Sequence, residues 1–322
     1  MRRVLVGLLA LCAGIGLLLA FGPREPVDLV ARFDAAALPA DLDRYLAAEE
    51  AKVAGITPGT EKRIVWAGAK GARTDLAVVY LHGFSATSEE IRPVPDLVAG
   101  ALGANLFYTR YAGHGLGGPR LAGPTVQDWV RDTAEALAIG RRIGSRVIVI
   151  GTSTGGTMAA EAALQPDLVQ GVAGIIFVAP NFGLRPLASR LLTLGGVRAW
   201  GPVVAGAERC FAPENDRHQT YWTTCYPTLA LLPMAAVARH AGAADYGRVT
   251  VPALFLFSDA DQVVSPQSTR AVAARWGAPV TLLLQTVGPG DNPYSHVIAG
   301  DILSPSMTAP ISFAMVGWIK GL

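Results

Sequence analysis

The sequence predicts an α/β protein built on a doubly wound, mostly parallel β-sheet. Short apolar runs rich in β-branched residues recur along the 322-residue chain, and helical stretches separate several of them. Most of these runs are continuous rather than alternating, as expected for parallel strands buried on both faces. The expected strands are residues 63–66, 76–81, 105–109, 146–150, 174–178, 253–257 and 281–287, and the expected intervening helices are residues 93–101, 126–139 and 155–164.

Composition narrows the class of protein further. Hydrophobic residues make up 51% of the chain and charged residues 16%, which excludes an intrinsically disordered protein. The net charge is only +2, from 27 basic and 25 acidic residues, and no stretch concentrates Lys and Arg. Nucleic acid is therefore not an expected partner. The sequence also contains no nucleotide-binding or metal-binding motif, so we expect no cofactor.

The N-terminal segment, residues 1–22, predicts a membrane anchor. Arg2 and Arg3 precede an uncharged apolar run over residues 4–21. Its length of about 18 residues lies between a signal-peptide core and a spanning helix. Pro23 directly follows the nearest cleavage candidate, which favours an uncleaved anchor over secretion after signal cleavage. In both cases the positive-inside rule places the body outside the cytoplasm, in the periplasm of a bacterial cell.

Two further regions follow this segment. Residues 23–58 predict a tether and a helix over residues 41–53, and residues 59–322 predict the α/β domain. About 70 residues between the strands 174–178 and 253–257 are too many for a plain loop. Their Leu and Trp residues indicate an inserted, mostly helical cap at about 184–248.

The insertion also contains the two cysteines of the body, Cys210 and Cys225. In an exported protein such a pair can form a disulfide closing a short loop, worth roughly 3 kcal/mol. The alternative is two unrelated thiols. The spacing of these cysteines and His218 lacks the close pairs of a zinc site, so no metal site is expected.

A nucleophile motif follows the strand 146–150. Gly151-Thr152-Ser153-Thr154-Gly155 has the pattern Gly-x-Ser-x-Gly and opens a helical stretch. A tight turn between strand and helix exposes the serine hydroxyl, and the small neighbours let the two elements approach. The sequence thus predicts Ser153 as a nucleophile.

A serine nucleophile needs a base and an acid that orients the base. In folds with this turn the chain order is serine, acid, histidine. Of the three histidines after Ser153, two lie in the insertion, which leaves His296, in the loop after the last expected strand. The acid is expected to be Asp261, in the turn after the strand 253–257, with Asp259 as the alternative.

The oxyanion hole is expected to combine two backbone N–H groups. One belongs to Thr154, directly after the nucleophile. The other is assigned to Phe84, in the loop that begins Leu81-His82-Gly83-Phe84. His82 is expected to brace this loop rather than to transfer protons.

Together these motifs resemble the α/β-hydrolase superfamily over residue 63 to the C-terminus. They are most similar to bacterial carboxylesterases and to monoacylglycerol lipase or lysophospholipase relatives that have a cap. The resemblance implies an α/β-hydrolase fold, a Ser153–Asp261–His296 triad and an oxyanion hole at Phe84 and Thr154. The motifs that support it are His82-Gly83-Phe84, the Ser153 turn, Gly113-His114-Gly115, Asp261 before Val263-Val264, and Ser295-His296. The apolar N-terminus, the helix before residue 58 and the cysteine pair are not part of the shared pattern.

The expected function is therefore hydrolysis of carboxylic esters through an acyl-enzyme on Ser153. The apolar insertion favours a neutral or lipid-like acyl ester, although the same side chains would equally serve to pack the insertion on the body. An acyltransferase that uses the same acyl-serine is the alternative, and a non-catalytic binding protein of this fold is a remote one. The sequence leaves the oligomeric state open.

Overall fold

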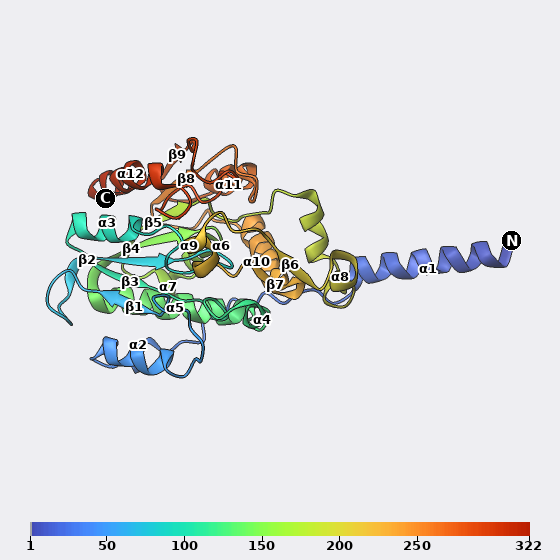
Figure 1. Ribbon diagram of the computed structural model, residues 1–322, viewed down its shortest axis with the longest axis horizontal. Helices are drawn as coiled ribbons and strands as arrows, with labels where there is room; N and C mark the ends of the chain where they lie inside the picture. The colour runs from blue at the N-terminus through green and yellow to red at the C-terminus, as the bar shows by residue number, and fades with distance from the viewer. Residues whose placement is uncertain (1) are drawn as a thin grey trace.

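A seven-stranded sheet forms the centre of the computed structural model, which describes residues 2–322. The strand order is β1-β3-β2-β4-β5-β8-β9 (Figure 1). Only the pair β1 and β3 is antiparallel, so the mostly parallel α/β sheet predicted from the sequence is confirmed. The strands are β1 (Arg63–Val65), β2 (Thr74–Leu81), β3 (Asn105–Tyr108), β4 (Gly144–Thr152), β5 (Val172–Val178), β8 (Ala253–Phe257) and β9 (Val280–Leu284).

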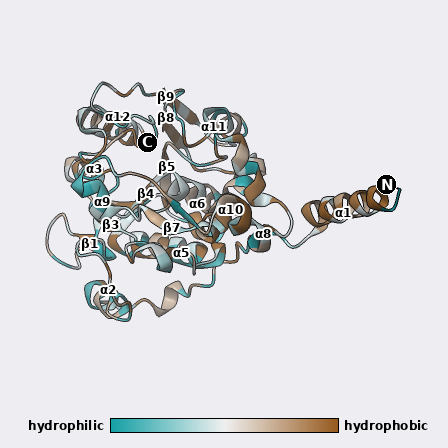
Figure 2. Ribbon diagram, turned by 45° about the vertical axis from the view of Figure 1, so that its right-hand side comes forward, coloured by the Kyte–Doolittle hydropathy of each residue, from teal (hydrophilic) through white to brown (hydrophobic). Residues whose placement is uncertain are grey.

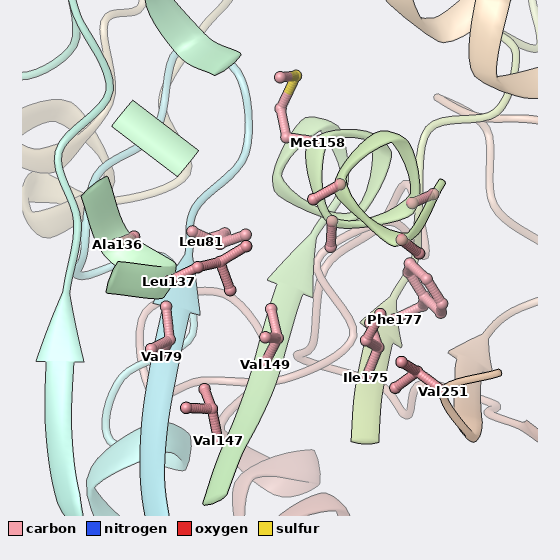
Figure 3. Packing of buried hydrophobic residues seen from close by; sticks show 14 of the residues in the cluster. Val79, Leu81, Ala136, Leu137, Val147, Val149, Met158, Ile175, Phe177 and Val251 are labelled. Atoms are coloured by element: carbon pink, nitrogen blue, oxygen red, sulfur yellow. The ribbon is translucent and has the colours of Figure 1, made fainter. Parts of the chain in front are cut away.

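Helices cover both faces of the sheet because the central strands are apolar on both sides. Val79 and Val149 face one buried cluster, which includes α5 (Val126–Ile143) and α6 (Thr154–Ala163), as Figure 3 shows. Their neighbours Val78 and Ile148 face a second cluster, with α3 (Val94–Leu102) and α12 (Thr308–Lys320). The shorter helices of the body are η1 (Ala35–Ala37), α4 (Gly118–Leu121), α7 (Pro166–Val169), α11 (Pro266–Ala273) and η4 (Pro305–Met307).

The insertion between β5 and β8 contains both helices and a small second sheet. In that sheet β6 pairs with β7 in antiparallel register, with Cys210 opposite Cys225, and the two cysteines form a disulfide. The two strands make the segment less purely helical than expected from the sequence. Its elements are η2 (Leu187–Thr193), α8 (Val197–Ala205), β6 (Glu208–Cys210), α9 (Asp216–Tyr221), β7 (Cys225–Pro227), η3 (Thr228–Ala230) and α10 (Leu231–Ala243).

The first helix, α1 (Arg2–Phe21), projects away from the folded body (Figures 1 and 2). None of its residues is buried, and the residues that follow Arg2 and Arg3 are mostly hydrophobic, as the colouring in Figure 2 shows. With 20 residues it measures about 30 Å, the thickness of a bilayer core. By length and composition it is able to cross a membrane, and a signal sequence has the same features.

Before the sheet, α2 (Leu42–Glu50) packs against the body through Leu42 and Leu46. It is shorter than the expected helix 41–53, because the chain turns away after Glu50. Glu50 itself is buried and accepts two hydrogen bonds from the Arg110 guanidinium, at 2.7 and 2.8 Å. This ion pair ties α2 to the loop after β3.

Removal of one partner of this pair is expected to destabilise the fold strongly. Glu50→Ala leaves the Arg110 charge buried without a counter-charge, which costs about 3–5 kcal/mol. Its neighbour Glu49 forms only a surface pair with Lys52, so Glu49→Ala is the matched control, with a loss of at most about 1 kcal/mol. Urea unfolding followed by circular dichroism measures both, and equal losses would contradict the assigned role of the buried pair.

Candidate active site

The backbone of Ser153 turns sharply between β4 and α6. Its φ of 50° and ψ of −115° are unfavourable for a residue with a side chain. Such a conformation costs on the order of 1–3 kcal/mol and persists only where its surroundings enforce it. Here the Ser153 N–H donates to the Val178 carbonyl at 2.9 Å, and the Ser153 carbonyl accepts from the N–H groups of Thr157 and Asn181 at 3.1 and 3.0 Å.

The glycines of the motif are required by the close approach of strand and helix. A Cβ atom at Gly155 would collide with the carbonyl oxygen of Leu81 on the neighbouring strand β2. A Cβ atom at Gly151 would lie 2.8 Å from the carbonyl oxygen of Gly155. The Gly-x-Ser-x-Gly spacing therefore reflects packing as well as the turn itself.

The structure brings Ser153, His296 and Asp261 together from three separate segments. His296 Nε2 lies 3.1 Å from Ser153 Oγ, and His296 Nδ1 lies 2.8 Å from Asp261 Oδ2. The other carboxylate oxygen of Asp261 accepts the backbone N–H groups of Val263 and Val264 at 2.8 and 2.9 Å. Asp261 is thus held as a hydrogen-bond acceptor, and it fixes the orientation of the imidazole.

The alternative acid, Asp259, lies elsewhere. Its side chain is 60% exposed and pairs with Arg270 at 2.8 Å. These two carboxylates are only two residues apart but differ in exposure, because the turn after β8 directs Asp261 inward.

The surroundings of His296 favour its protonated form. Burial of the ring opposes protonation, but the Asp261 carboxylate and, more weakly, Glu90 outweigh burial and raise the pKa of His296 above its usual value. Ser153 itself is 7% exposed, so the site is largely shielded from bulk water. A buried imidazole between a hydroxyl and a carboxylate is the arrangement that a general base requires.

His82 holds the carbonyl of the peptide between Gly83 and Phe84. His82 Nε2 accepts the Tyr111 N–H at 3.1 Å, so its Nδ1 holds the proton and donates to the Gly83 carbonyl at 2.8 Å. Burial, reinforced by the neighbouring His114, lowers the pKa of His82 well below its usual value, and the ring stays neutral. The N–H of the same peptide, on Phe84, donates no hydrogen bond within residues 2–322.

Thr154 provides the second expected donor at the start of α6. Its N–H likewise has no acceptor among the described residues, because the first N–H groups of a helix have no intrahelical partner. The N–H groups of Phe84 and Thr154 thus both lie beside the Ser153 turn without an acceptor among the described residues, and their role in an oxyanion hole stays a prediction.

Glu90 is the residue of this site that sequence reasoning missed. It is 2% exposed, and its Oε2 accepts the Gly83 N–H at 2.7 Å and the Tyr80 hydroxyl at 3.0 Å. Burial raises the pKa of Glu90 to about 7, although the Gly83 N–H and His296 favour its charged form. In the sequence Glu89-Glu90 has the appearance of a charged loop, and no local pattern marks the second carboxylate as buried.

The insertion covers this site. The Tyr226 ring packs edge-on against Phe84, with centroids 5.4 Å apart, and the Thr223 N–H donates to the Ser85 carbonyl at 2.7 Å. From α10, the Met234 sulfur accepts a hydrogen bond from Asn181, directly beside the Ser153 turn. A substrate must therefore reach Ser153 past side chains of the insertion.

Comparisons with known proteins agree with this architecture. A family model described as "Alpha/beta hydrolase family" matches residues 78–297. One solved structure, from work on the metagenome-derived lipolytic enzymes LipS and LipT, is 20% identical with a TM-score of 0.67, and the alignment covers 83% of this chain and all of that one. The monoglyceride lipase of Saccharomyces cerevisiae is 13% identical with a TM-score of 0.61, over 81% of this chain and 90% of that chain. The monoacylglycerol lipase of Paleococcus ferrophilus is 16% identical with a TM-score of 0.55, over 80% and 96%. A search of curated proteins finds no match.

The geometry predicts that Ser153 reacts with a fluorophosphonate, which labels only activated serines. Asp261→Asn removes the charge that orients His296, and the labelling rate is expected to fall by about 10⁴-fold. Asp259→Asn is the matched control and is expected to change the rate less than about 3-fold, because Asp259 makes only an exposed pair. Equal effects of the two variants in a gel-based labelling assay would contradict the assignment of the acid.

Proposed function

The chain belongs to the alpha/beta hydrolase family, and on that basis we propose that it is a serine hydrolase that cleaves carboxylic esters through an acyl-enzyme on Ser153. The observation that supports this most is the continuous hydrogen-bonded series from Ser153 Oγ through His296 to Asp261. The lipolytic names of several structural neighbours agree with this reaction class.

In the first half of the proposed reaction, His296 Nε2 accepts the Ser153 hydroxyl proton as Oγ attacks the ester carbonyl carbon. The resulting oxyanion accepts hydrogen bonds from the N–H groups of Phe84 and Thr154. Each such donor contributes about 2.7–4 kcal/mol in comparable hydrolases. His296 then gives its proton to the leaving alkoxide, and the alcohol departs from the acyl-enzyme.

In the second half, His296 takes a proton from water, and the hydroxide attacks the acyl carbon of the Ser153 ester. The tetrahedral intermediate collapses, Ser153 Oγ regains a proton from His296, and the carboxylic acid leaves. Throughout the cycle Asp261 keeps its charge, since it stabilises the imidazolium and does not itself become protonated.

We also propose a lipid-like or neutral acyl ester as substrate and an extracytoplasmic membrane location. The side chains by which the insertion contacts the site, such as Tyr226 and Met234, are largely apolar. The disulfide of Cys210 and Cys225 fits an oxidising compartment, and α1 fits a membrane anchor. Together they support a location of the catalytic body on the outer side of the membrane.

Acyl transfer to an alcohol is the second candidate, and the low exposure of Ser153 favours it. Exclusion of water from a covered site slows hydrolysis of an acyl-enzyme relative to its reaction with a bound alcohol. The two reactions share the acyl-Ser153 and differ only in the second nucleophile, so their products distinguish them.

Hydrolysis of p-nitrophenyl esters from acetyl to palmitoyl chains tests the proposed function. With the full chain in mild detergent, turnover is expected and its chain-length optimum reports the depth of the acyl pocket. Ser153→Ala is expected to lower kcat by at least about 10⁴-fold. Ser189→Ala, at a partly exposed position of the insertion, is the matched control.

Hydrolysis that persists in Ser153→Ala would contradict the mechanism. A different outcome would favour the acyltransferase hypothesis. In that case fluorophosphonate labels the wild type and an added alcohol becomes acylated, but no free acid is released.

The pH dependence tests the contact of Glu90 with the site. Ionised Glu90 raises the pKa of His296, and activity requires neutral His296. Glu90→Gln is therefore expected to shift the acid limb of the kcat/KM profile to lower pH. The folded-state pKa of Glu90, about 7, exceeds its ordinary 4.5, so the wild type loses stability as the pH rises from about 4.5 through 7.

The glutamine variant lacks this loss of stability. Its free energy of unfolding, relative to the wild type, is expected to be higher at pH 8 than at pH 5. An unchanged acid limb together with an unchanged stability difference would show that Glu90 does not titrate in this range.

A further inference from the structure

The end of α1 is hydrogen-bonded to the insertion. The N–H of Gly195 donates to the Leu19 carbonyl at 2.9 Å, and the N–H of Gly196 donates to the Pro23 carbonyl at 2.7 Å. The last carbonyl groups of a helix have no partner within it. The loop before α8 thus supplies hydrogen-bond donors to the Leu19 carbonyl near the end of α1 and to the Pro23 carbonyl just after the helix.

Three glycines permit this contact. A Cβ atom at Gly195 would collide with the Leu18 carbonyl oxygen, and one at Gly196 would lie 2.9 Å from Leu18 Cδ1. A Cβ atom at Gly22 would lie 3.1 Å from the Gly196 nitrogen. The two backbones therefore meet at a distance that only glycine allows on either side.

An ion pair lies beside this contact. Arg198 Nη2 lies 2.7 Å from both carboxylate oxygens of Glu25, whose side chain is only 4% exposed. We call Gly195, Gly196 and Arg198, together with their partners at the end of α1, the anchor contact.

Around the anchor contact the insertion exposes large apolar side chains. Leu187 and Val203 are 75% and 85% exposed, and Leu191 and Val204 are 45% and 69% exposed. They lie on η2 and α8, and α8 is at the end of the body from which α1 projects (Figure 1). We call these four residues the apolar rim.

A cavity of about 350 Å³ lies at the same junction. Its lining includes the cationic side chains of Arg24, directly after α1, and of Arg239 on α10, together with His240. Apolar side chains bury themselves at the boundary between headgroups and acyl chains, and arginines beside them attract lipid phosphates. The apolar rim and the arginines of this cavity are therefore both complementary to the surface of a lipid bilayer.

We propose that α1 stays attached to the mature protein and that the anchor contact holds the apolar rim against the lipid bilayer that α1 crosses. The cover of the active site then lies on the membrane surface, with the bilayer as its partner. Cleavage after Gly22 would remove the Leu19 carbonyl that Gly195 binds and the glycine that packs against Gly196. The inference rests on the proposed membrane location and not on the ester chemistry.

The length of the mature chain gives the first test. Intact-mass analysis of the protein purified from membranes is expected to show residues 1–22 present. A mature chain that begins at Pro23 would overturn the proposal.

The second test measures the contact of the rim with lipid. An environment-sensitive dye is attached at Val203→Cys in the full chain in anionic phospholipid vesicles, with the free Cys12 replaced by alanine. The control is Leu97→Cys, which is 45% exposed on α3, far from α1 (Figure 1). Iodide quenching is expected to be several-fold weaker at position 203 than at position 97. Equal quenching at both positions would overturn the proposal.

The anchor contact itself is tested by Gly195→Val in the dye-labelled protein. The added side chain cannot fit against Leu18, so iodide quenching at position 203 is expected to rise toward that at position 97. Gly68→Val is the matched control, because a side chain at Gly68 meets nothing within 4 Å. If Gly195→Val leaves quenching unchanged, the anchor contact does not position the rim.

Hydrolysis of soluble p-nitrophenyl acetate, measured on the same samples, reports separately on the site. The rate of hydrolysis is expected to be the same in Gly195→Val and Gly68→Val, and this result would show that Gly195→Val is folded. If the unmodified chain shows the lipid contact but does not hydrolyse the ester, the proposed function is contradicted and the proposed membrane contact is not.

Discussion

The turn at Ser153 depends on the parallel packing of β4 against its neighbours. The backbone of this serine adopts an unfavourable conformation that is held by hydrogen bonds to Val178 on β5 and to Asn181 beyond it. Gly155 makes room for the carbonyl of Leu81 on β2, so both adjacent strands constrain the same turn. The strain is balanced by the stability of the whole sheet, and the candidate nucleophile lies directly after its central strand, β4.

The loop after β2 is positioned by the same sheet. Because β2 lies beside β4, this loop reaches the Ser153 turn, where His82 holds the Gly83 carbonyl and Glu90 holds the Gly83 N–H. One of these two groups is a neutral imidazole, and the other is a carboxylate whose pKa burial raises to about 7. The loop is thus held in place by the fold itself, and in the proposed mechanism the Phe84 N–H that it presents needs no rearrangement to stabilise an oxyanion.

The central strands and the residues of the candidate site were predictable because their signals are local. Continuous apolar runs mark buried strands, and Gly-x-Ser-x-Gly between strand and helix identifies Ser153, from which chain order selects His296. Glu90 was not predictable, because no local pattern marks this loop carboxylate as buried, even though its partners Tyr80 and Gly83 lie nearby in sequence. The contact of Gly195 with Leu19 at the end of α1 was hidden because the two residues lie far apart in the chain. The bounds of edge strands were the hardest to predict. The expected strand 281–287 is β9 in the structure and ends at Leu284, because the residues of this edge strand are only partly buried and show no continuous buried pattern.

The proposed mechanism depends on a covalent acyl-enzyme at Ser153. Rapid quenching of the full chain with a p-nitrophenyl ester in acid, followed by peptide mass spectrometry, tests it most directly. If Ser153 is the nucleophile, a burst of about one p-nitrophenolate per chain is expected, with an acyl adduct on the peptide that contains Ser153. Steady turnover with no adduct on that peptide at any quench time, or an adduct on a different residue, would contradict it.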